Sequence, residues 1–143
     1  MNNFYGPLFK FCQAVVRIFY PKYRVVSDKP LDQTVVYVSH HQNMHGPFVI
    51  LLWFPKSIRC WILHVFMDKK SCYRHYSEYT FSERFKWNKT IAKGIAYLVS
   101  RFIPALLNSG KGIPVYRGSR HILKTFKQSV DALKNGESIV IFP

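Results

Sequence analysis

Three of the six histidines lie within six positions, at His40, His41 and His45, directly after the apolar run TVVYVS. Histidine titrates near neutral pH, so an imidazole here can accept the proton of an alcohol that attacks an acyl carbonyl or thioester. A helix is expected to begin near Gly46, and its free N–H groups can bind a phosphate or a developing oxyanion. The cluster therefore has the residue types that acyl transfer needs.

The histidines have two other interpretations. Any one of them taken alone is typical of a polar loop at the start of a helix. His41 and His45 are four positions apart, as in some metal sites, but their segment precedes the helix and no nearby Cys, Asp or Glu completes a ligand set. We therefore expect no metal ion and no bound cofactor.

A second candidate lies in the segment GIPVYRG, where Arg117 leaves a predicted short strand that lies between Gly112 and Gly118. A guanidinium can form a bidentate pair with a phosphate, and the small neighbours let a ligand approach the backbone. Arg117 is therefore a candidate phosphate-binding residue. The alternative is a solvated arginine at the end of a strand.

Three segments together resemble the glycerolipid acyltransferases. Residues 38–47, VSHHQNMHGP, are similar to the family's first block, a His followed after four residues by Asp and often Pro, and alignment on Pro47 places the catalytic base at His41. Residues 113–118, IPVYRG, are similar to the second block, whose arginine corresponds to Arg117. Residues 139–143, IVIFP, are similar to the strand before the third block, which usually continues into Glu-Gly. The blocks agree in order and spacing from about residue 35 to the end.

The resemblance implies an enzyme of phospholipid biosynthesis. It would move a fatty acyl group from acyl-CoA or acyl carrier protein to the free hydroxyl of a lysophospholipid such as 1-acyl-glycerol-3-phosphate. His41 would deprotonate that hydroxyl, and Arg117 would hold the acceptor phosphate. The other substrate-binding positions that the resemblance implies are Gly118, Asn43, Gly46 and Pro47.

One departure from the family pattern concerns Gly46, which stands where the family has the Asp that orients the catalytic histidine. Glycine has no side chain, so His41 is either poorly oriented or oriented by another residue. The candidates are Asn43, His45 and Asp68. The same departure supports a rival hypothesis, a non-catalytic lipid-binding protein with the same fold.

Composition favours a membrane surface as partner. The 143 residues carry a net charge of +14, and 48% are hydrophobic and 17% aromatic, which fits one folded domain and excludes disorder. The basic residues are scattered among aromatic ones, as in segments that lie against lipid headgroups, so a basic nucleic-acid-binding domain is the less favoured alternative. The three cysteines include no CxxC pair. This cysteine usage fits a reducing cytoplasm, so we expect a peripheral position on the cytoplasmic face of the cell membrane.

Residues 1–22 are expected to form an amphipathic, membrane-interfacial helix, with Lys10 and Arg17 reaching toward headgroups. An ordinary amphipathic helix packed on the domain is the alternative. No stretch reaches the roughly 18 uncharged apolar residues of a spanning helix. Residues 23–143 are expected to form the acyltransferase domain.

That domain is predicted to be α/β, a layered sheet flanked by helices, similar to glycerol-3-phosphate acyltransferase and incomplete at its C-terminus. The expected strands are 23–27, 34–39, 58–66, a short one within 112–118, and 138–142, with 34–39 central and covered on both faces. The expected helices include one starting near Gly46, one or two within 90–107 broken near Pro104, and one from Ser119 to Asn135 with Ser119 as N-cap. Because the chain stops on an apolar strand, it is interpreted as a fragment.

Overall fold

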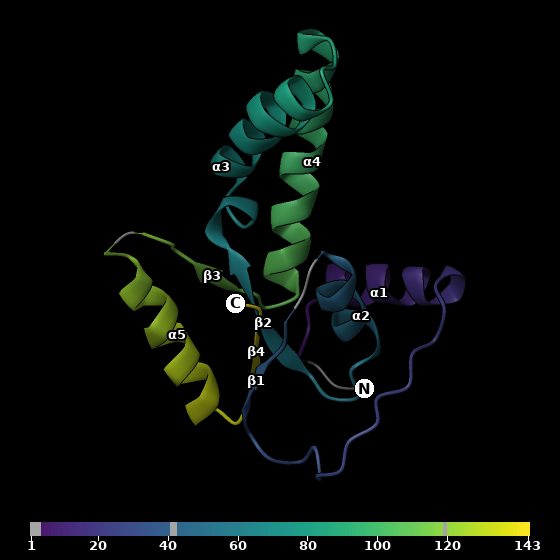
Figure 1. Ribbon diagram of the computed structural model, residues 1–143, viewed down its shortest axis with the longest axis vertical. Coiled ribbons are helices and arrows are strands. Elements are labelled where there is room, and N and C mark those ends of the chain that lie inside the picture. Colours follow the sequence, from purple (N-terminus) through teal and green to yellow (C-terminus); the bar gives the residue numbers. More distant parts are fainter. Residues whose placement is uncertain (1–3, 41–42, 119) are drawn as a thin grey trace.

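The computed structural model describes residues 4–40, 43–118 and 120–143. Its centre is a four-stranded parallel sheet in the order β1-β4-β2-β3 (Figure 1). The strands are β1 (Val36–Val38), β2 (Ile58–Leu63), β3 (Ile113–Val115) and β4 (Ser138–Ile141). The predicted α/β class, a layered sheet with helices, is confirmed.

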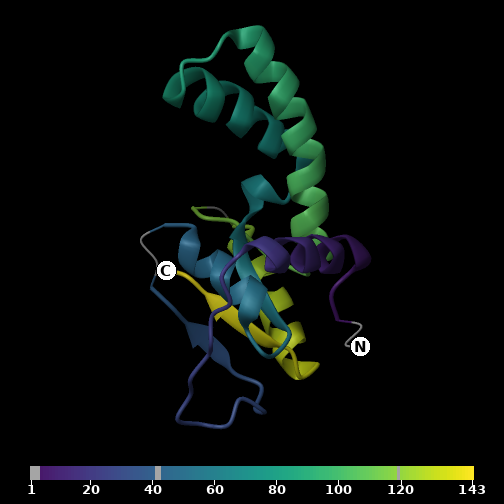
Figure 2. The same cartoon turned by 90° about the vertical axis from the view of Figure 1, so that its right-hand side faces the viewer.

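Helices cover both faces of this sheet. On one side lies α2 (His45–Trp53), with α1 (Pro7–Phe19) outside it, and on the other side lies α5 (Ile122–Lys134). A short 3₁₀ turn, η1 (His64–Phe66), follows β2 and leads into α3 (Lys69–Arg74), the π-helical segment η2 (His75–Arg84) and α4 (Lys89–Ser109). These last elements rise from the end of the sheet as a separate arm (Figure 2).

Alternation along β4 divides the core between the two faces, because successive side chains of a strand point to opposite sides. Val140 packs with Ile58 and Cys60 on the α2 side. Ile139 packs with Ile113 and Ala132 on the α5 side. Both β4 residues are only 1% exposed, so the last strand in the sequence forms the middle of the sheet.

The structure differs from the prediction at the two expected strands nearest the N-terminus, 23–27 and 34–39. Residues 23–27 form no strand, and β1 pairs with β4 alone among the described residues. Tyr37 packs toward α2, but Val38 is 70% exposed because α5 does not extend over β1. The prediction of a central strand covered on both faces is therefore wrong. An apolar run of six residues could not reveal that only one face finds a partner.

The N-terminal helix is docked by one side and exposed on the other. Phe9 is buried, Gln13 Nε2 donates to the Leu51 carbonyl at 2.7 Å, and Arg17 Nε donates to the Leu52 carbonyl at 2.8 Å. The Arg17 guanidinium also lies 5.2 Å from the centre of the Trp53 ring. Arg17 therefore contacts α2 through its guanidinium, whereas Ile18 on the outer side is 75% exposed. The interfacial position of this helix stays a prediction.

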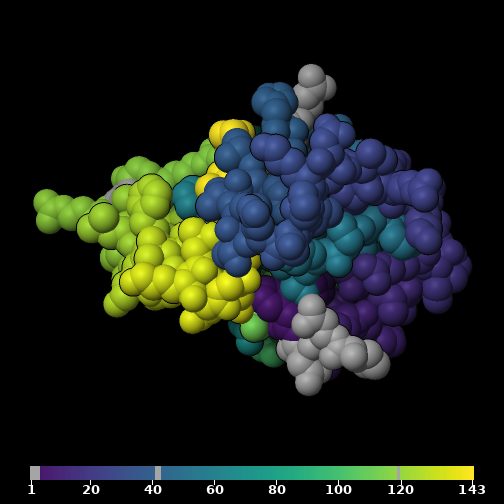
Figure 3. All heavy atoms as spheres, turned by 90° about the horizontal axis from the view of Figure 1, so that it is seen from below, coloured from purple at the N-terminus to yellow at the C-terminus, as the bar shows by residue number. Residues whose placement is uncertain are grey.

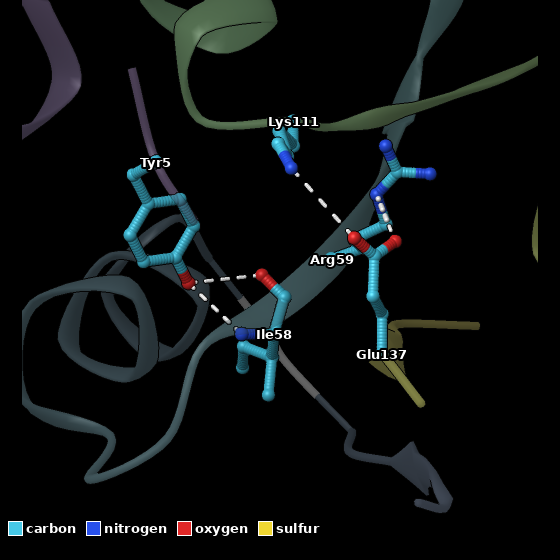
Figure 4. Close-up of polar contacts among 5 residues, drawn as sticks. All are labelled: Tyr5, Ile58, Arg59, Lys111 and Glu137. Atoms are coloured by element: carbon cyan, nitrogen blue, oxygen red, sulfur yellow. Dashed lines mark hydrogen bonds and ion pairs between the residues drawn. The ribbon is translucent and has the colours of Figure 1, made fainter. Parts of the chain in front are cut away.

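Polar contacts close the edge of the sheet where the strands begin (Figure 4). The Tyr5 hydroxyl donates to the Ile58 carbonyl at 2.9 Å and accepts from the Ile58 N–H at 3.0 Å. Glu137 lies 3.2 Å from Arg59 and 3.7 Å from Lys111. Seen from below, the blue segment that links α1 to β1 spreads over the surface beside the yellow end of the chain (Figure 3). These contacts tie the N-terminal segment to the start of β2 and pair Glu137, which precedes β4, with Arg59 and Lys111.

The arm consists of one long helix, α4, that packs against two shorter helical segments, α3 and η2. The sequence predicts a helix break near Pro104, but α4 runs unbroken from Lys89 to Ser109 with Pro104 buried inside it. The Asn108 amide donates to the Pro104 carbonyl at 2.7 Å. Among the described helices, α4 alone is long and apolar enough to cross a membrane, and 22% of its most apolar window is buried.

The last helix begins later than predicted and ends as predicted. α5 starts at Ile122 with His121 as its N-cap residue, and Ser119, the expected cap, lies outside the described residues. At the other end Gly136 has φ +76°, and the Gly136 and Glu137 N–H groups donate to Leu133 and Ala132. Glycine tolerates this left-handed conformation, and it directs the chain into β4.

Candidate functional site

All four strands are parallel, so the segments that follow them meet at one edge of the sheet, here called the carboxyl edge. β1 is followed by Ser39 and His40, β2 by His64, β3 by Tyr116 and Arg117, and β4 by Phe142. The three segments with family resemblance therefore all lead to this edge. The edge is also where the arm begins (Figure 1).

The histidine segment of the first block is described in part. His41, the predicted base, lies outside the described residues, and His40 is exposed. The helix that the sequence predicts near Gly46 begins at His45, and Pro47 is buried in its first turn. Asn43 Oδ1 accepts the His45 N–H at 2.9 Å and so holds the start of this helix.

The three residues considered as replacements for the missing Asp all have partners of their own. Besides the bond of Asn43, His45 Nδ1 lies 2.9 Å from the Tyr20 hydroxyl. Asp68 Oδ2 accepts the Ser71 N–H at 2.8 Å and caps α3. That backbone N–H holds the pKa of the Asp68 carboxyl below its ordinary value, so the group is ionised at neutral pH. Their role toward His41 stays a prediction.

Arg117 lies in the turn that follows β3, and both it and Gly118 are exposed. Gly118 has φ +68°, the left-handed conformation that glycine adopts without a steric penalty. Just before the arginine, the Tyr116 ring stacks on the His64 ring with centroids 4.8 Å apart. This contact joins the ends of β3 and β2 and fixes the backbone from which Arg117 projects.

A hollow of about 320 Å³ opens beside Tyr116, between the ends of β2 and β3 and the foot of the arm. Its walls include two apolar residues, Met67 and Pro114, and several polar ones. The polar lining residues are His64, Asp68, Ser71, Asn108 and Tyr116. The hollow is large enough for part of a small polar ligand and lies at the same edge as Arg117.

The sequence did not single out His64, because the predicted strand 58–66 includes it; in the structure β2 ends at Leu63 and His64 follows directly. Its Nδ1 lies 3.3 Å from the Val115 carbonyl. The tautomer that donates a proton to this oxygen carries a free lone pair on Nε2, which makes Nε2 the basic atom. A strand prediction that ended at Leu63 would have placed this histidine at the carboxyl edge beside the other candidates.

The strand order sets the distance between the ends of the two strands that lead to His41 and to Arg117. β1 and β3 are at opposite ends of the sheet, with β4 and β2 between them. Three steps of about 4.8 Å separate their axes by roughly 14 Å. The carboxyl ends of β1 and β3, which lead to His41 and Arg117, therefore lie on one edge of the sheet. The end of β2, which His64 follows, is adjacent to β3, whereas the end of β1 is three strands away.

Cysteine chemistry is unfavourable in the core. Burial raises the pKa of the Cys60 thiol to about 12 and raises that of Cys72 as well, so both are protonated at neutral pH. Only Cys12 is partly exposed. Among the described residues, no group of three or more His, Cys, Asp or Glu side chains is arranged to hold a metal ion.

Comparison of the chain with protein-family models, with curated proteins and with solved structures gives no significant match. The proposed function therefore rests on the residues of the chain and on their geometry.

Proposed function

We propose that the chain provides the site of an acyltransferase that moves a fatty acyl group from an acyl thioester to the hydroxyl of a lysophospholipid, in phospholipid biosynthesis. One observation carries the proposal. Three segments that resemble parts of the glycerolipid acyltransferase blocks overlap β1, β3 and β4, and the carboxyl ends of these parallel strands lie at a single edge of the sheet. Ligands of open parallel sheets bind at that edge.

In the proposed reaction His41 accepts the proton of the acceptor hydroxyl. The hydroxyl oxygen forms an ester bond with the acyl carbon, the carbon–sulfur bond of the thioester breaks, and the proton passes from the imidazolium to the departing thiolate. At the start of α2 the Gly46 N–H is the candidate donor to the oxyanion, because the His45 N–H bonds to Asn43 Oδ1 and Pro47 has no N–H. No protein nucleophile is required.

Arg117 holds the phosphate of the acceptor in this proposal, since its guanidinium is exposed at the carboxyl edge and can pair bidentately with phosphate oxygens. The surplus of basic residues attracts both the anionic donor, acyl-CoA or acyl carrier protein, and an anionic membrane surface. The working position that follows is peripheral, on the cytoplasmic face of the membrane.

A second histidine competes for the role of base within the same function. His64 lines the hollow, its ring is held by Tyr116 and the Val115 carbonyl, and Asp68 lines the same wall. If the acceptor binds in the hollow, His64 is the histidine that lines its site. The two candidates make different predictions for single substitutions.

The experiment measures radiolabelled phosphatidic acid formed from acyl-CoA and lysophosphatidic acid. His41→Ala should lower kcat by about 10²–10⁴-fold, the usual contribution of a general base, whereas its neighbour substitution His40→Ala should leave kcat within about threefold. Arg117→Ala should raise the KM for the acceptor about 10–100-fold without changing that for the donor, and Arg120→Ala in the same exposed loop is the control. Unchanged turnover in His41→Ala together with loss of turnover in His64→Ala would move the base to His64.

The rival function is that of a non-catalytic lipid-binding protein, and Gly46 favours it because glycine cannot orient an imidazole. Gly46→Asp restores the family residue at the second position of α2. A gain of at least about tenfold in turnover supports the enzyme. No product in either protein over a range of acyl donors, with lysophosphatidic acid bound by both, supports the rival.

A further inference from the structure

The arm, defined as residues 69–109, departs from the sheet as a helical hairpin that connects two neighbouring strands, β2 and β3 (Figures 1 and 2). Two strands that are adjacent and parallel can be joined by one short helix. The arm uses α3, η2 and the 21-residue α4 instead. Most of its length projects beyond the sheet, so most of its outer surface packs neither on the sheet nor on the helices that cover the sheet.

The two sides of α4 differ in the size of their apolar residues. The side that packs on α3 and η2 buries small residues, of which Ala92 and Ala96 are 0% exposed. The opposite side carries large ones: Ile91 is 57% exposed, Leu98 67% and Phe102 47%. These three recur at helical spacing and form an apolar stripe along the outside of α4. A core helix would show the reverse arrangement.

Charge on this part of the arm has one sign. From residue 84 to residue 109 the sequence contains five basic residues, Arg84, Lys86, Lys89, Lys93 and Arg101, and no Asp or Glu. The Arg101 guanidinium lies 4.7 Å from the centre of the exposed Tyr97 ring, beside the apolar stripe. The apolar surface is therefore bordered by positive charge, which suits an anionic partner and repels a second copy of the same surface.

The tip of the arm is aromatic. Trp87 stacks on the buried Phe81 with ring centroids 5.0 Å apart, and Phe85 stacks beside it at 5.8 Å. Both Phe85 and Trp87 are nevertheless about half exposed. Tryptophan beside lysine is the combination that is enriched where proteins meet the headgroup layer of a bilayer.

We propose that the outer side of α4 and the aromatic tip of the arm form the surface by which this protein binds an anionic lipid bilayer. The apolar stripe of Ile91, Leu98 and Phe102 inserts among the acyl chains, and the basic residues pair with anionic headgroups. The arm thus offers a second surface for membrane contact, besides the interfacial helix predicted within residues 1–22. This inference does not depend on acyl transfer, because it concerns lipid binding in the absence of any donor.

Co-sedimentation with vesicles made of phosphatidylcholine and phosphatidylglycerol in equal parts tests the proposal. Ile91→Ser/Leu98→Ser should weaken binding at least about tenfold, since two large side chains lose their burial in the bilayer. The matched control is Leu123→Ser/Val130→Ser, which removes two exposed apolar residues from α5 and should leave binding within about twofold. Far-ultraviolet circular dichroism shows whether each variant keeps its helices.

Charge variants keep the test valid if the apolar variant fails to fold. Lys86→Gln/Lys89→Gln/Lys93→Gln should weaken binding about 100-fold on anionic vesicles, since each basic residue near the surface contributes about fivefold. On vesicles of phosphatidylcholine alone the same variant should bind like the unmodified protein. Lys124→Gln/Lys127→Gln on α5, with two exposed lysines removed, is the control. Quenching of fluorescence by lipids brominated on their acyl chains should disappear in Trp87→Phe.

Three outcomes would overturn the proposal. Loss of vesicle binding in Phe11→Ser/Ile18→Ser, with no loss in the arm variants, would assign the contact to α1. Self-association that is abolished by Ile91→Ser/Leu98→Ser would assign the stripe to a second copy of the chain. Duplex nucleic acid bound more tightly than vesicles at the same salt concentration would assign the charge to a nucleic acid. An inactive protein whose arm still governs vesicle binding contradicts only the proposed acyl transfer.

Discussion

The sheet body and the arm place their large apolar side chains on opposite sides. In the body the large residues are inside, and Ile58, Ile139 and Val140 are each 1% exposed. In the arm, α4 contributes the small residues Ala92 and Ala96 to a buried cluster around Phe81, while its large residue Leu98 lies outside. Small residues let two helices approach closely but bury little apolar area. The sheet is therefore stabilised by large buried side chains, whereas α4 leaves its large side chains Ile91, Leu98 and Phe102 exposed for a partner.

The largest expected effect comes from exchanging large residues of the two regions for alanine. Ile139→Ala should lower the free energy of unfolding by about 2–5 kcal/mol, because it leaves a cavity on the α5 side of the sheet. Leu98→Ala should change it by less than about 0.5 kcal/mol, because the side chain touches solvent. Urea unfolding followed by circular dichroism measures both. Similar losses would show that the Leu98 side chain is buried in solution.

A smaller effect is expected from the tyrosine that ties the N-terminal segment to the body. Tyr5→Phe removes the hydroxyl that bonds both the N–H and the carbonyl of Ile58, and it should cost about 1–3 kcal/mol. Burial also raises the pKa of this tyrosine, as expected for a hydroxyl enclosed by the protein. Tyr79→Phe in the arm, where the ring is exposed, is the control and should be neutral. Equal stability of the two variants would contradict this anchoring role.

The smallest effect concerns the junction of body and arm, where Asp68 caps α3. Asp68→Ala should cost about 1 kcal/mol, and Asp68→Asn, which can still cap, should cost less. Because the Ser71 N–H lowers the pKa of Asp68, the stabilisation by its charge is present at neutral pH and lost as the pH falls below about 4. Thermal unfolding between neutral and acidic pH measures this. A gap between the original protein and Asp68→Asn that widens on acidification would contradict it.

Elements with local signals were predictable from the sequence. The apolar runs of β2 and β4, the start of α2 beside Pro47 and the end of α5 at Gly136 are written in adjacent residues. The course of α4 through Pro104 was not, because its integrity depends on packing against η2 and on the Asn108 amide. Nor was the strand order, since pairing partners are set by contacts between distant residues.

The candidate site was predictable in part for the same reason. Short motifs identify Arg117 and the histidine segment, and the parallel sheet brings their strands to one edge. The hollow is different, because it combines His64, Asn108 and Tyr116 from three separate stretches of the chain. No spacing in the sequence connects these residues, and only the fold of the arm onto the strand ends places them together.

The position of β4 has a consequence for biosynthesis. Its residues come last among the strands, yet they pair with Val36 on one side and Ile58 to Cys60 on the other. At about 5–20 residues per second, a ribosome needs roughly 4–15 s to reach β4 after finishing β2, and during that time both flanking strands lack their shared neighbour. Nascent chains stalled in this interval should be bound by chaperones. This binding should decrease in chains that are stalled after β4 has left the ribosome.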